Sequence, residues 1–324
     1  MTVHVTNGDI VVDLLRRAGL AGDALAWADV LHEGPVPAGL DDAGLRQARA
    51  EFLAGADSAD TADVLRRLTE RDHALAAGRA GDYLLWFEAD LYDQLQIAQI
   101  LATLGDLGVA PDRVNLVCIG EYPGIAHFGG LGELEPEQLA GLPEAVATPL
   151  TAEALELGAA AWDALRAPDP AGLGRIAASR SPQLRFLGEA FDRLAREYPS
   201  TRDGLSLAER RTLAATPSGG APAGTVFARL GERERRPYLA DLFFFRMVTR
   251  LATATVPLLE LDPPDGQVGP GTRLRLTEAG GRVLRGEADH VGLNGIDRWV
   301  GGVHLQGAEA PWRWDEGTES VTRW

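Results

Sequence analysis

Residues 84–101 have the sequence LLWFEADLYDQLQIAQIL. The apolar run from Tyr83 to Phe87 predicts a buried strand, and the apolar spacing over residues 90–105 predicts a helix that starts directly after it. A strand that leads straight into a helix is the repeating unit of α/β proteins. Three carboxylates stand at this junction: Glu88, Asp90 and Asp93. The stretch therefore predicts the fold and also marks the first place to look for a functional site.

The same alternation continues on both sides of this stretch. Strands are expected at residues 3–6, 25–30 and 113–119, and helices at 9–19 and across 41–79. Each predicted strand is a continuous apolar run, which is typical of parallel strands that are covered on both faces. Residues 1–134 are therefore predicted to form a Rossmann-like α/β domain, a parallel sheet with helices on both faces.

The second half of the chain has a different pattern. Residues 135–198 predict a helical segment, and YPSTRDG (198–204) has the composition of a linker. From 205 to 290 we expect three helices, a two-stranded wing and a closing helix, which is the arrangement of a winged helix. The tail, 291–324, is expected to form short strands with exposed tryptophans.

Composition limits the class of protein. The chain has 324 residues, which favours two domains, and its 45% hydrophobic and 24% charged residues are typical of a globular protein. No apolar run approaches the roughly 20 residues that cross a bilayer, and no signal-peptide layout is seen, so we expect a cytoplasmic protein with no membrane partner. The lone Cys118 excludes an internal disulfide. The lack of lysine excludes Schiff-base chemistry and a P-loop lysine.

Charge is divided unevenly along the chain. Residues 1–199 contain 15 arginines and 31 acidic residues, whereas residues 200–290 contain 13 arginines and 11 acidic residues. Nonspecific binding to nucleic acid needs a positive surface. Only the second segment is therefore a candidate for DNA binding.

The candidate DNA contacts in that segment are Arg233, Arg235 and Arg236, which form its one basic cluster and could contact phosphates. Glu232 and Glu234 interleave with them and weaken the local positive charge. A winged helix that docks a protein or has a structural role is the favoured interpretation.

Four polar loops follow predicted strands. In a parallel sheet the loops after the strands open on one edge, where ligands bind. These loops are Asn7-Gly8-Asp9, His32-Glu33, Glu88-Ala89-Asp90 and Glu121-Tyr122. We therefore expect them to build one acidic pocket.

The three carboxylates allow two interpretations. Asp90 can cap the helix with Asp93 as its capping-box partner. Helix capping does not account for Glu88, which follows Phe87 at the strand end and should be partly desolvated. The functional alternative is a site for a divalent ion such as Mg²⁺, with Asp90 and Asp93 as ligands and Glu88 as an acid or base of raised pKa.

Asn7, Gly8 and Asp9 are the candidate contacts to a cofactor or ligand phosphate. They join the first strand to the first helix, where free backbone amides bind phosphate in α/β proteins. Asp9 would repel an anion unless a cation lies between them, so a nucleotide here should come with a metal. The alternative is a tight turn followed by an Asp cap.

His32 is the candidate general base or metal ligand, because it follows a strand and should lie next to carboxylates from neighbouring strands. The alternative is a residue of a surface turn. His127 is a weaker candidate, and His4 is expected in the core. Cys118 is interpreted as an inert core thiol.

Five motifs together resemble a bacterial family filed as domain of unknown function 1835: VTNGD (5–9), DVLHEGPVP (29–37), WFEADLYDQLQ (86–96), LVCIGEYPG (116–124) and NGIDRWVGGVHL (294–305). They are spread over nearly the whole chain. The resemblance implies an amino-terminal α/β domain paired with a carboxyl-terminal part. It implies no activity and no catalytic residues.

The leading hypothesis is a domain that binds a small phosphorylated or nucleotide-like ligand, with Mg²⁺, at the strand ends. Hydrolysis or group transfer is the expected reaction class. In this hypothesis His32 and Glu88 are the catalytic candidates. The alternatives are a ligand-sensing regulator whose winged helix binds DNA, and a protein-interaction module.

Overall fold

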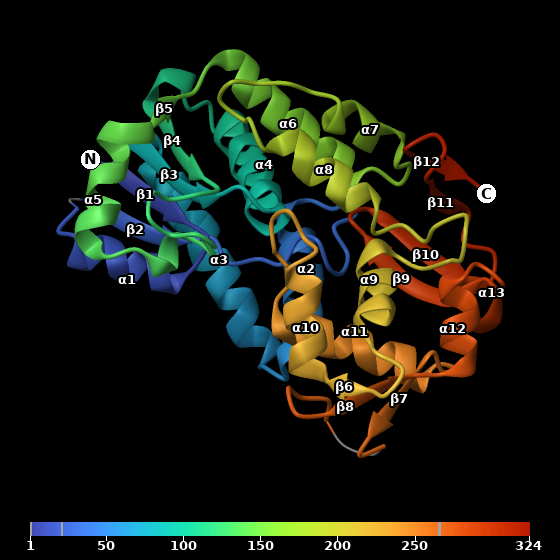
Figure 1. The fold of residues 1–324 in the computed structure, drawn as a ribbon. Coiled ribbons are helices and arrows are strands. Elements are labelled where there is room, and N and C mark those ends of the chain that lie inside the picture. The colour runs from blue at the N-terminus through green and yellow to red at the C-terminus, as the bar shows by residue number, and fades with distance from the viewer. Residues whose placement is uncertain (1, 21, 265–266) are drawn as a thin grey trace.

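The computed structural model describes residues 2–20, 22–264 and 267–324. A five-stranded sheet lies in the amino-terminal half, on the left in Figure 1. Its strands are β1 (Thr2–Thr6), β2 (Asp23–Ala26), β3 (Asp82–Glu88), β4 (Val114–Ile119) and β5 (Thr148–Pro149). The predicted strand–helix junction after residue 87 is confirmed, because β3 leads directly into α4 (Leu91–Asp106).

The strand order is β2-β1-β3-β4-β5, and β1 to β4 are parallel. The chain therefore adds β2 on one side of β1 and later returns to add β3 on the other side. The expectation of an all-parallel sheet is wrong for β5, which pairs antiparallel with β4, Leu116 opposite Thr148. This two-residue strand lies at the edge of the sheet, where mixed sheets commonly carry an antiparallel strand.

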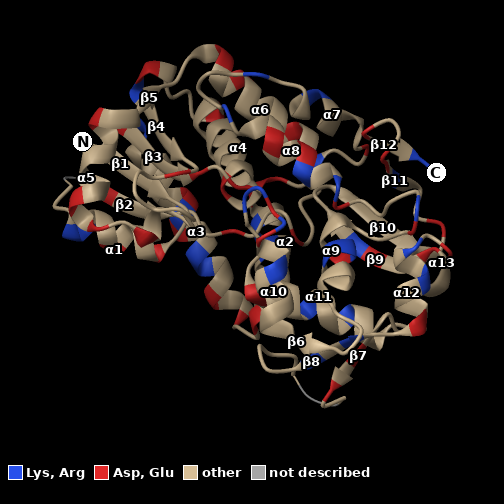
Figure 2. Ribbon diagram, in the orientation of Figure 1, with Lys and Arg blue, Asp and Glu red and all other residues tan. Residues whose placement is uncertain are grey.

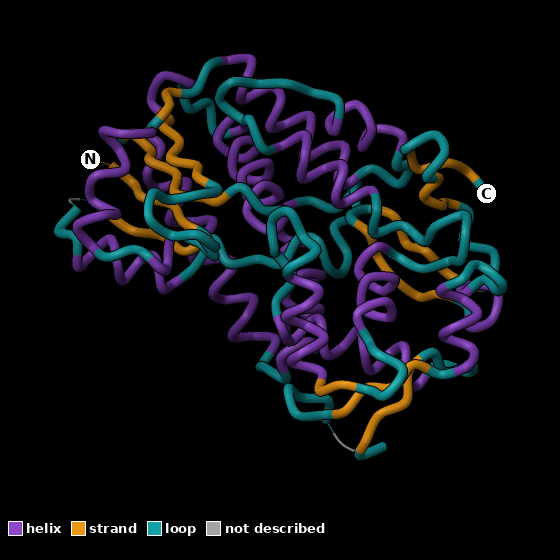
Figure 3. Tube along the Cα trace, viewed as in Figure 1, coloured by secondary structure: helices purple, strands orange, loops and turns teal. Residues whose placement is uncertain are grey.

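Helices cover both faces of the sheet, as predicted. On one face, Trp86 packs with Val117 against α1 (Asp9–Arg17) and α5 (Pro136–Val146). On the other face, Leu85 and Phe87 join a larger core with α4. Because successive strand side chains point to opposite faces, the continuous apolar run of β3 supplies both cores. Figure 3 shows the strands between these helices.

The second strand ends earlier than expected, at Ala26 instead of residue 30. An irregular segment follows, and the guanidinium of Arg49 holds it in place. Arg49 donates to the Asp29 carboxylate at 2.7 Å and to the carbonyl oxygens of Val30 and Glu33 at 2.9 and 2.7 Å. These bonds satisfy backbone groups that a longer strand would have paired. Arg49 belongs to α2 (Asp42–Asp57), which is followed by α3 (Thr61–Ala77).

The predicted helical segment and the tail share the larger core. The helices are α6 (Ala152–Arg166), α7 (Ala171–Ala177) and α8 (Leu187–Ala195), and the tail contains α13 (His290–Asn294), β9 (Ile296–Val300), β10 (Val303–Gly307), β11 (Trp312–Asp315) and β12 (Ser320–Arg323). Tail residues such as Leu305 belong to the same buried cluster as Phe191 of α8. The expectation of exposed tryptophans is correct for Trp324, 66% exposed, and wrong for Trp314, 2% exposed, which the core covers.

Residues 205–283 contribute a separate apolar core. The elements around it are α9 (Leu207–Ala215), β6 (Ala221–Pro222), α10 (Ala223–Gly231), α11 (Asp241–Thr253), β7 (Leu259–Asp262), β8 (Arg273–Leu276) and α12 (Glu278–Leu284). The predicted capping box of Ser206 and Glu209 is confirmed. The expected two-stranded hairpin has a third strand, because β6 pairs with β8.

Short 3₁₀ turns complete the described elements: Gly78–Ala80, Pro111–Arg113 and Leu131–Glu133. Within the described residues, no helix has the length and hydropathy needed to cross a bilayer.

The contact between α4 and α6 gives a test of this architecture. A Cβ added at Gly158 of α6 would lie 2.7 Å from the Cβ of Leu101, whereas a Cβ at Gly141 of α5 would meet nothing within 4 Å. We expect Gly158→Ala to lower the free energy of unfolding by about 2 kcal/mol through overpacking. Gly141→Ala should raise it by about 0.5 kcal/mol, because alanine favours the helix. Urea unfolding of both variants checks this, and a stabilised Gly158→Ala would contradict the packing described.

Candidate functional site

The ends of β1 and β3 meet through one side chain. The Asn7 amide nitrogen, Nδ2, donates to Glu88 Oε1 at 3.1 Å and to both carboxylate oxygens of Asp93 at 3.1 Å. Asn7 directly follows β1, Glu88 is the last residue of β3, and Asp93 lies in the first turn of α4. The strand order reverses between β1 and β3, which is the place where open α/β sheets bind ligands.

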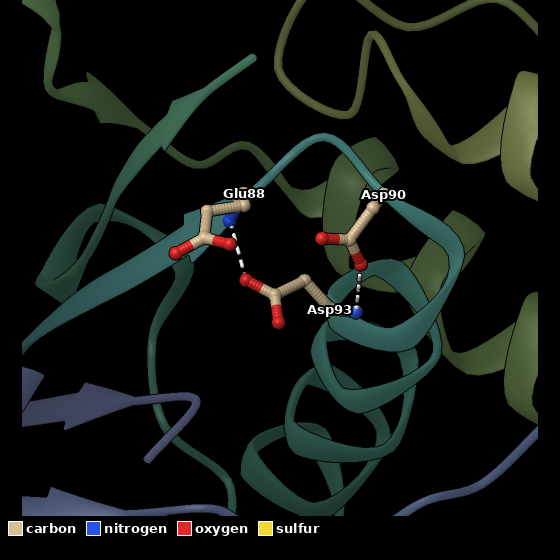
Figure 4. A group of neighbouring side chains, drawn as sticks. All are labelled: Glu88, Asp90 and Asp93. Atoms are coloured by element: carbon tan, nitrogen blue, oxygen red, sulfur yellow. Dashed lines mark hydrogen bonds between the residues drawn. The ribbon is translucent and has the colours of Figure 1, made fainter. Parts of the chain in front are cut away.

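Asp90 has a structural role at the start of α4. Its Oδ1 accepts a hydrogen bond from the Asp93 backbone N–H at 2.9 Å, so the predicted N-cap is confirmed. A capping box would also join the Asp93 carboxylate to the Asp90 backbone N–H. The Asp93 carboxylate accepts from the Glu88 backbone N–H instead, at 2.5 Å (Figure 4). Helix capping therefore accounts for Asp90 and leaves the carboxylate of Asp93 turned toward the strand end.

The three carboxylates form one compact group. Glu88, Asp90 and Asp93 each offer an oxygen atom, and these atoms lie within 4.8 Å of one another (Figure 4). Within the described ranges, no other three histidine, cysteine or carboxylate side chains are close enough to share an ion. The spacing suits a single cation bound by oxygen.

Burial raises the pKa of each carboxyl group. The pKa of Glu88 rises to about 7, because of burial first and then the neighbouring Asp90. Burial also raises the pKa of Asp90 to about 6. The pKa of Asp93 lies well above its ordinary value, through burial and the charges of Asp90 and Glu88. Near neutral pH the group therefore holds protons or needs a cation.

Glu88 and Asp90 line a pocket of about 80 Å³. A glycine-rich loop forms one wall, where the Leu131 backbone N–H donates to Glu88 Oε1 at 2.7 Å. Gly130 has a φ of +144°, and a Cβ there would lie 2.6 Å from Glu88 Oε2. Glycine is thus required at this position for both conformation and space. The pocket has room for an ion with a few waters.

Arg235 and Arg236 also line this pocket. They come from the segment between α10 and α11, in the part of the chain predicted to be a winged helix. Both arginines pair with Glu189 of α8, at 3.2 and 3.4 Å. The sequence predicts them as contacts to DNA phosphates, which stays a prediction, and the structure shows that they lie beside the carboxylate group. Nothing in their local sequence indicates this position, because apart from Pro237 the pocket is lined by residues more than 100 positions away.

His32 is separate from the carboxylate group. It is 3% exposed, and its ring lies against the rings of Tyr92, Tyr238 and Phe243. Neither ring nitrogen has a hydrogen-bond partner in the described part of the chain. Burial lowers the pKa of His32 to about 3, and the nearby Arg49 contributes to the lowering. The imidazole is therefore neutral and enclosed, away from the pocket where a general base was expected.

Only one of the three predicted phosphate-turn residues reaches the cluster. Asn7 contacts it directly, as a hydrogen-bond donor to carboxylates. Gly8 is the N-cap of α1. Its φ of −178° is an extended conformation that any residue adopts. Asp9 is exposed and lines a different groove, whose lining also includes Ala26 and Arg71.

The remaining predicted residues have clear positions. His4 is buried, as expected, and accepts a hydrogen bond at Nδ1 from Trp86 Nε1 at 3.0 Å. His127 and Glu121 are exposed. Burial raises the pKa of the Cys118 thiol to about 12, which fits the interpretation of an inert thiol.

Comparison of the sequence with protein family models finds no match, and comparison with curated proteins finds none either. The resemblance to domain of unknown function 1835 therefore stays a prediction. The function has to be argued from the geometry of the carboxylate group and its surroundings.

The raised pKa of Glu88 predicts an unusual pH dependence of stability. Between pH 4.5 and about 7, the native metal-free protein binds more protons at Glu88 than the unfolded chain does, so stability contributed by this group falls as pH rises. We expect Glu88→Gln to be more stable than the unsubstituted protein at pH 8, by up to about 3 kcal/mol. The difference should shrink toward zero below pH 4.5.

Urea unfolding in EDTA at several pH values measures this effect. Glu121→Gln is the matched control, because Glu121 is exposed in a loop of the same sheet edge. Glu121→Gln should not reproduce the gain in stability that we expect of Glu88→Gln at pH 8. A Glu88→Gln variant that loses stability at pH 8 would show that the carboxylate is favourably ionised there.

Proposed function

We propose that the protein binds a divalent cation such as Mg²⁺ through Glu88, Asp90 and Asp93, together with a small phosphorylated or nucleotide-like ligand. The observation that carries this proposal is the set of three largely buried carboxylates with oxygens within 4.8 Å of one another. Like charges at that spacing in a desolvated site are stabilised by a cation. Their position, where the strand order reverses between β1 and β3, adds support, because ligands bind there in α/β sheets.

The donor set suits a hard cation. Mg²⁺ prefers oxygen ligands and is usually held by one or two carboxylates, with waters and ligand phosphates in the other positions. Asn7 orients Glu88 and Asp93 by donating to both, and the backbone of α4 fixes Asp90. The site is therefore organised by bonds that do not depend on an ion.

Hydrolysis or group transfer at a phosphoryl centre is the reaction class we propose. A bound cation would supply charge neutralisation at the phosphoryl oxygens. Glu88, whose pKa of about 7 is close to neutral pH, is the acid–base group in this proposal. His32 is assigned no direct contact with the ligand, because its ring is enclosed by Tyr92 and Tyr238.

For residues 205–290 we propose a winged-helix arrangement, on the basis of the three helices α9 to α11 followed by the β7–β8 hairpin. In such a fold the third helix is the one that enters DNA. Here α11 contacts α2: Phe243 stacks on Phe52, and Arg246 donates to the carbonyl oxygen of Gly55 at 3.1 Å. This contact favours docking within the chain over the DNA-binding alternative.

Metal binding is tested by thermal unfolding with and without Mg²⁺ or Mn²⁺. We expect either ion to stabilise the protein, by about 2.7 kcal/mol at 100 times its dissociation constant. Asp93→Asn should abolish the stabilisation, because it removes one of three charges while keeping an oxygen that can accept the Glu88 N–H bond.

Asp112→Asn is the control. Asp112 is exposed just before β4, at the amino ends of the strands, whereas the carboxylate group lies at their carboxyl ends. The response of this control variant to metal should equal that of the unsubstituted protein. Equal stabilisation of the Asp93→Asn variant, or none for the unsubstituted protein, would refute the metal site. If metal binds, release of phosphate from a panel of nucleotides, compared between the protein and Glu88→Gln, tests the proposed reaction.

A further inference from the structure

A second pocket, of about 280 Å³, adjoins the carboxylate group. Its walls come from α8 and α9, from the junction between β3 and α4, and from the segment before α11. Ala89, Arg235 and Arg236 line both pockets. A ligand in the larger pocket would therefore reach the carboxylates past the small side chain of Ala89.

More arginines than acidic residues line the larger pocket, and two carboxylates outside the lining, Glu197 and Glu316, also pair with Arg193 and Arg196 at 2.7 and 3.8 Å. Five arginines and three acidic residues line it: Arg193, Arg196, Arg211, Arg235 and Arg236, with Glu189, Asp192 and Glu234. This contrasts with the acidic composition of residues 1–199, which contain 15 arginines and 31 acidic residues. Figure 2 shows basic and acidic segments close together where α8 approaches α9. The arginines come from elements that pack in both apolar cores, such as α8 in the first and α9 in the second.

Single carboxylates are shared between pairs of these arginines. Glu234 contacts both Arg193 and Arg211 at 2.7 Å. Glu189 forms one ion pair with Arg235 at 3.2 Å and one with Arg236 at 3.4 Å, and the side chain of Arg235 is 78% exposed. Each guanidinium has five N–H donors, so sharing Glu189 leaves donors of Arg235 and Arg236 available for a bound anion. Arg193 has a structural role instead, because it also pairs with Glu197 at 2.7 Å.

We propose that this pocket is an anion subsite that takes the phosphate groups of the ligand, with Arg235 and Arg236 as its principal contacts. Guanidinium groups bind phosphate oxygens in a bidentate manner and keep their charge at any physiological pH. The ligand is thus a phosphorylated small molecule whose anionic end lies among the arginines and whose other contact is the cation held by Glu88, Asp90 and Asp93. The second part of this statement rests on the proposed function, whereas the anion subsite does not.

The subsite also gives the second apolar core a role in the site. Arg193 lies on α8 in the first core, while Arg235 and Arg236 follow α10 in the second. Glu234, beside them in the chain, is tied to Arg193. The position of the two phosphate-binding arginines therefore depends on how the two cores meet.

Calorimetric titration of the full-length protein with inorganic pyrophosphate in EDTA tests the subsite. We expect binding that weakens with salt, and a loss of about tenfold in affinity for the double variant Arg235→Gln, Arg236→Gln. Arg233→Gln is the matched control, because Arg233 is exposed in the same segment and lines neither pocket. Its affinity should be unchanged.

Three outcomes would overturn the inference: no pyrophosphate binding by the unsubstituted protein, equal affinity of the double variant, or an equal loss in the Arg233→Gln control, which would indicate nonspecific attraction. A titration with Mn²⁺ alone separates the subsite from the metal site. Pyrophosphate binding without Mn²⁺ binding would support the subsite and refute the metal site. Mn²⁺ binding without pyrophosphate binding would do the reverse.

Discussion

The candidate site depends on the crowding of three carboxyl groups at one partly dry position. Burial raises the pKa values of Glu88, Asp90 and Asp93, and repulsion by neighbouring carboxylates adds to the rise for Glu88 and Asp93. The fold offsets part of this cost with hydrogen-bond donors: the Asn7 amide, the Leu131 N–H and the first turn of α4. A bound cation or a proton would relieve the remaining unfavourable electrostatic free energy. The arrangement therefore favours binding of a cation or proton and lowers the stability of the fold.

A buried charge network at the end of α8 connects the two apolar cores. Glu197 accepts hydrogen bonds from Arg193 and Arg298, each at 2.7 Å. Burial alone would raise the pKa of Glu197, but the two guanidinium groups outweigh it and lower the pKa to about 2. Arg193 also donates to Glu234, in the segment that follows α10 of the second core. The segment that carries Arg235 and Arg236 is thereby held beside the carboxylate group, so arginines and carboxylates line one pocket where the two cores meet.

Much of the α/β half could be predicted from the sequence. Strands β3 and β4 are apolar runs between turns, and helix starts such as Asp90 follow from local hydrogen-bonding rules. The end of the second strand could not be placed, because it is set by Arg49, which lies more than 20 residues further along the chain. The direction of β5 likewise depends on the sheet edge that it meets, and its two residues contain no signal for it.

The sequence by itself determined which residues are carboxylates at the strand–helix junction and which run of chain is apolar enough to be buried. Tertiary structure alone decided what surrounds them. It enclosed His32 among aromatic rings and placed the Asn7 amide where it donates to two carboxylates. It also brought arginines from the segment after α10 to the pocket that the carboxylates line. The physical reason is range: strands and caps are set by contacts within a few residues, whereas a binding pocket is built from residues that only packing of the whole chain brings together.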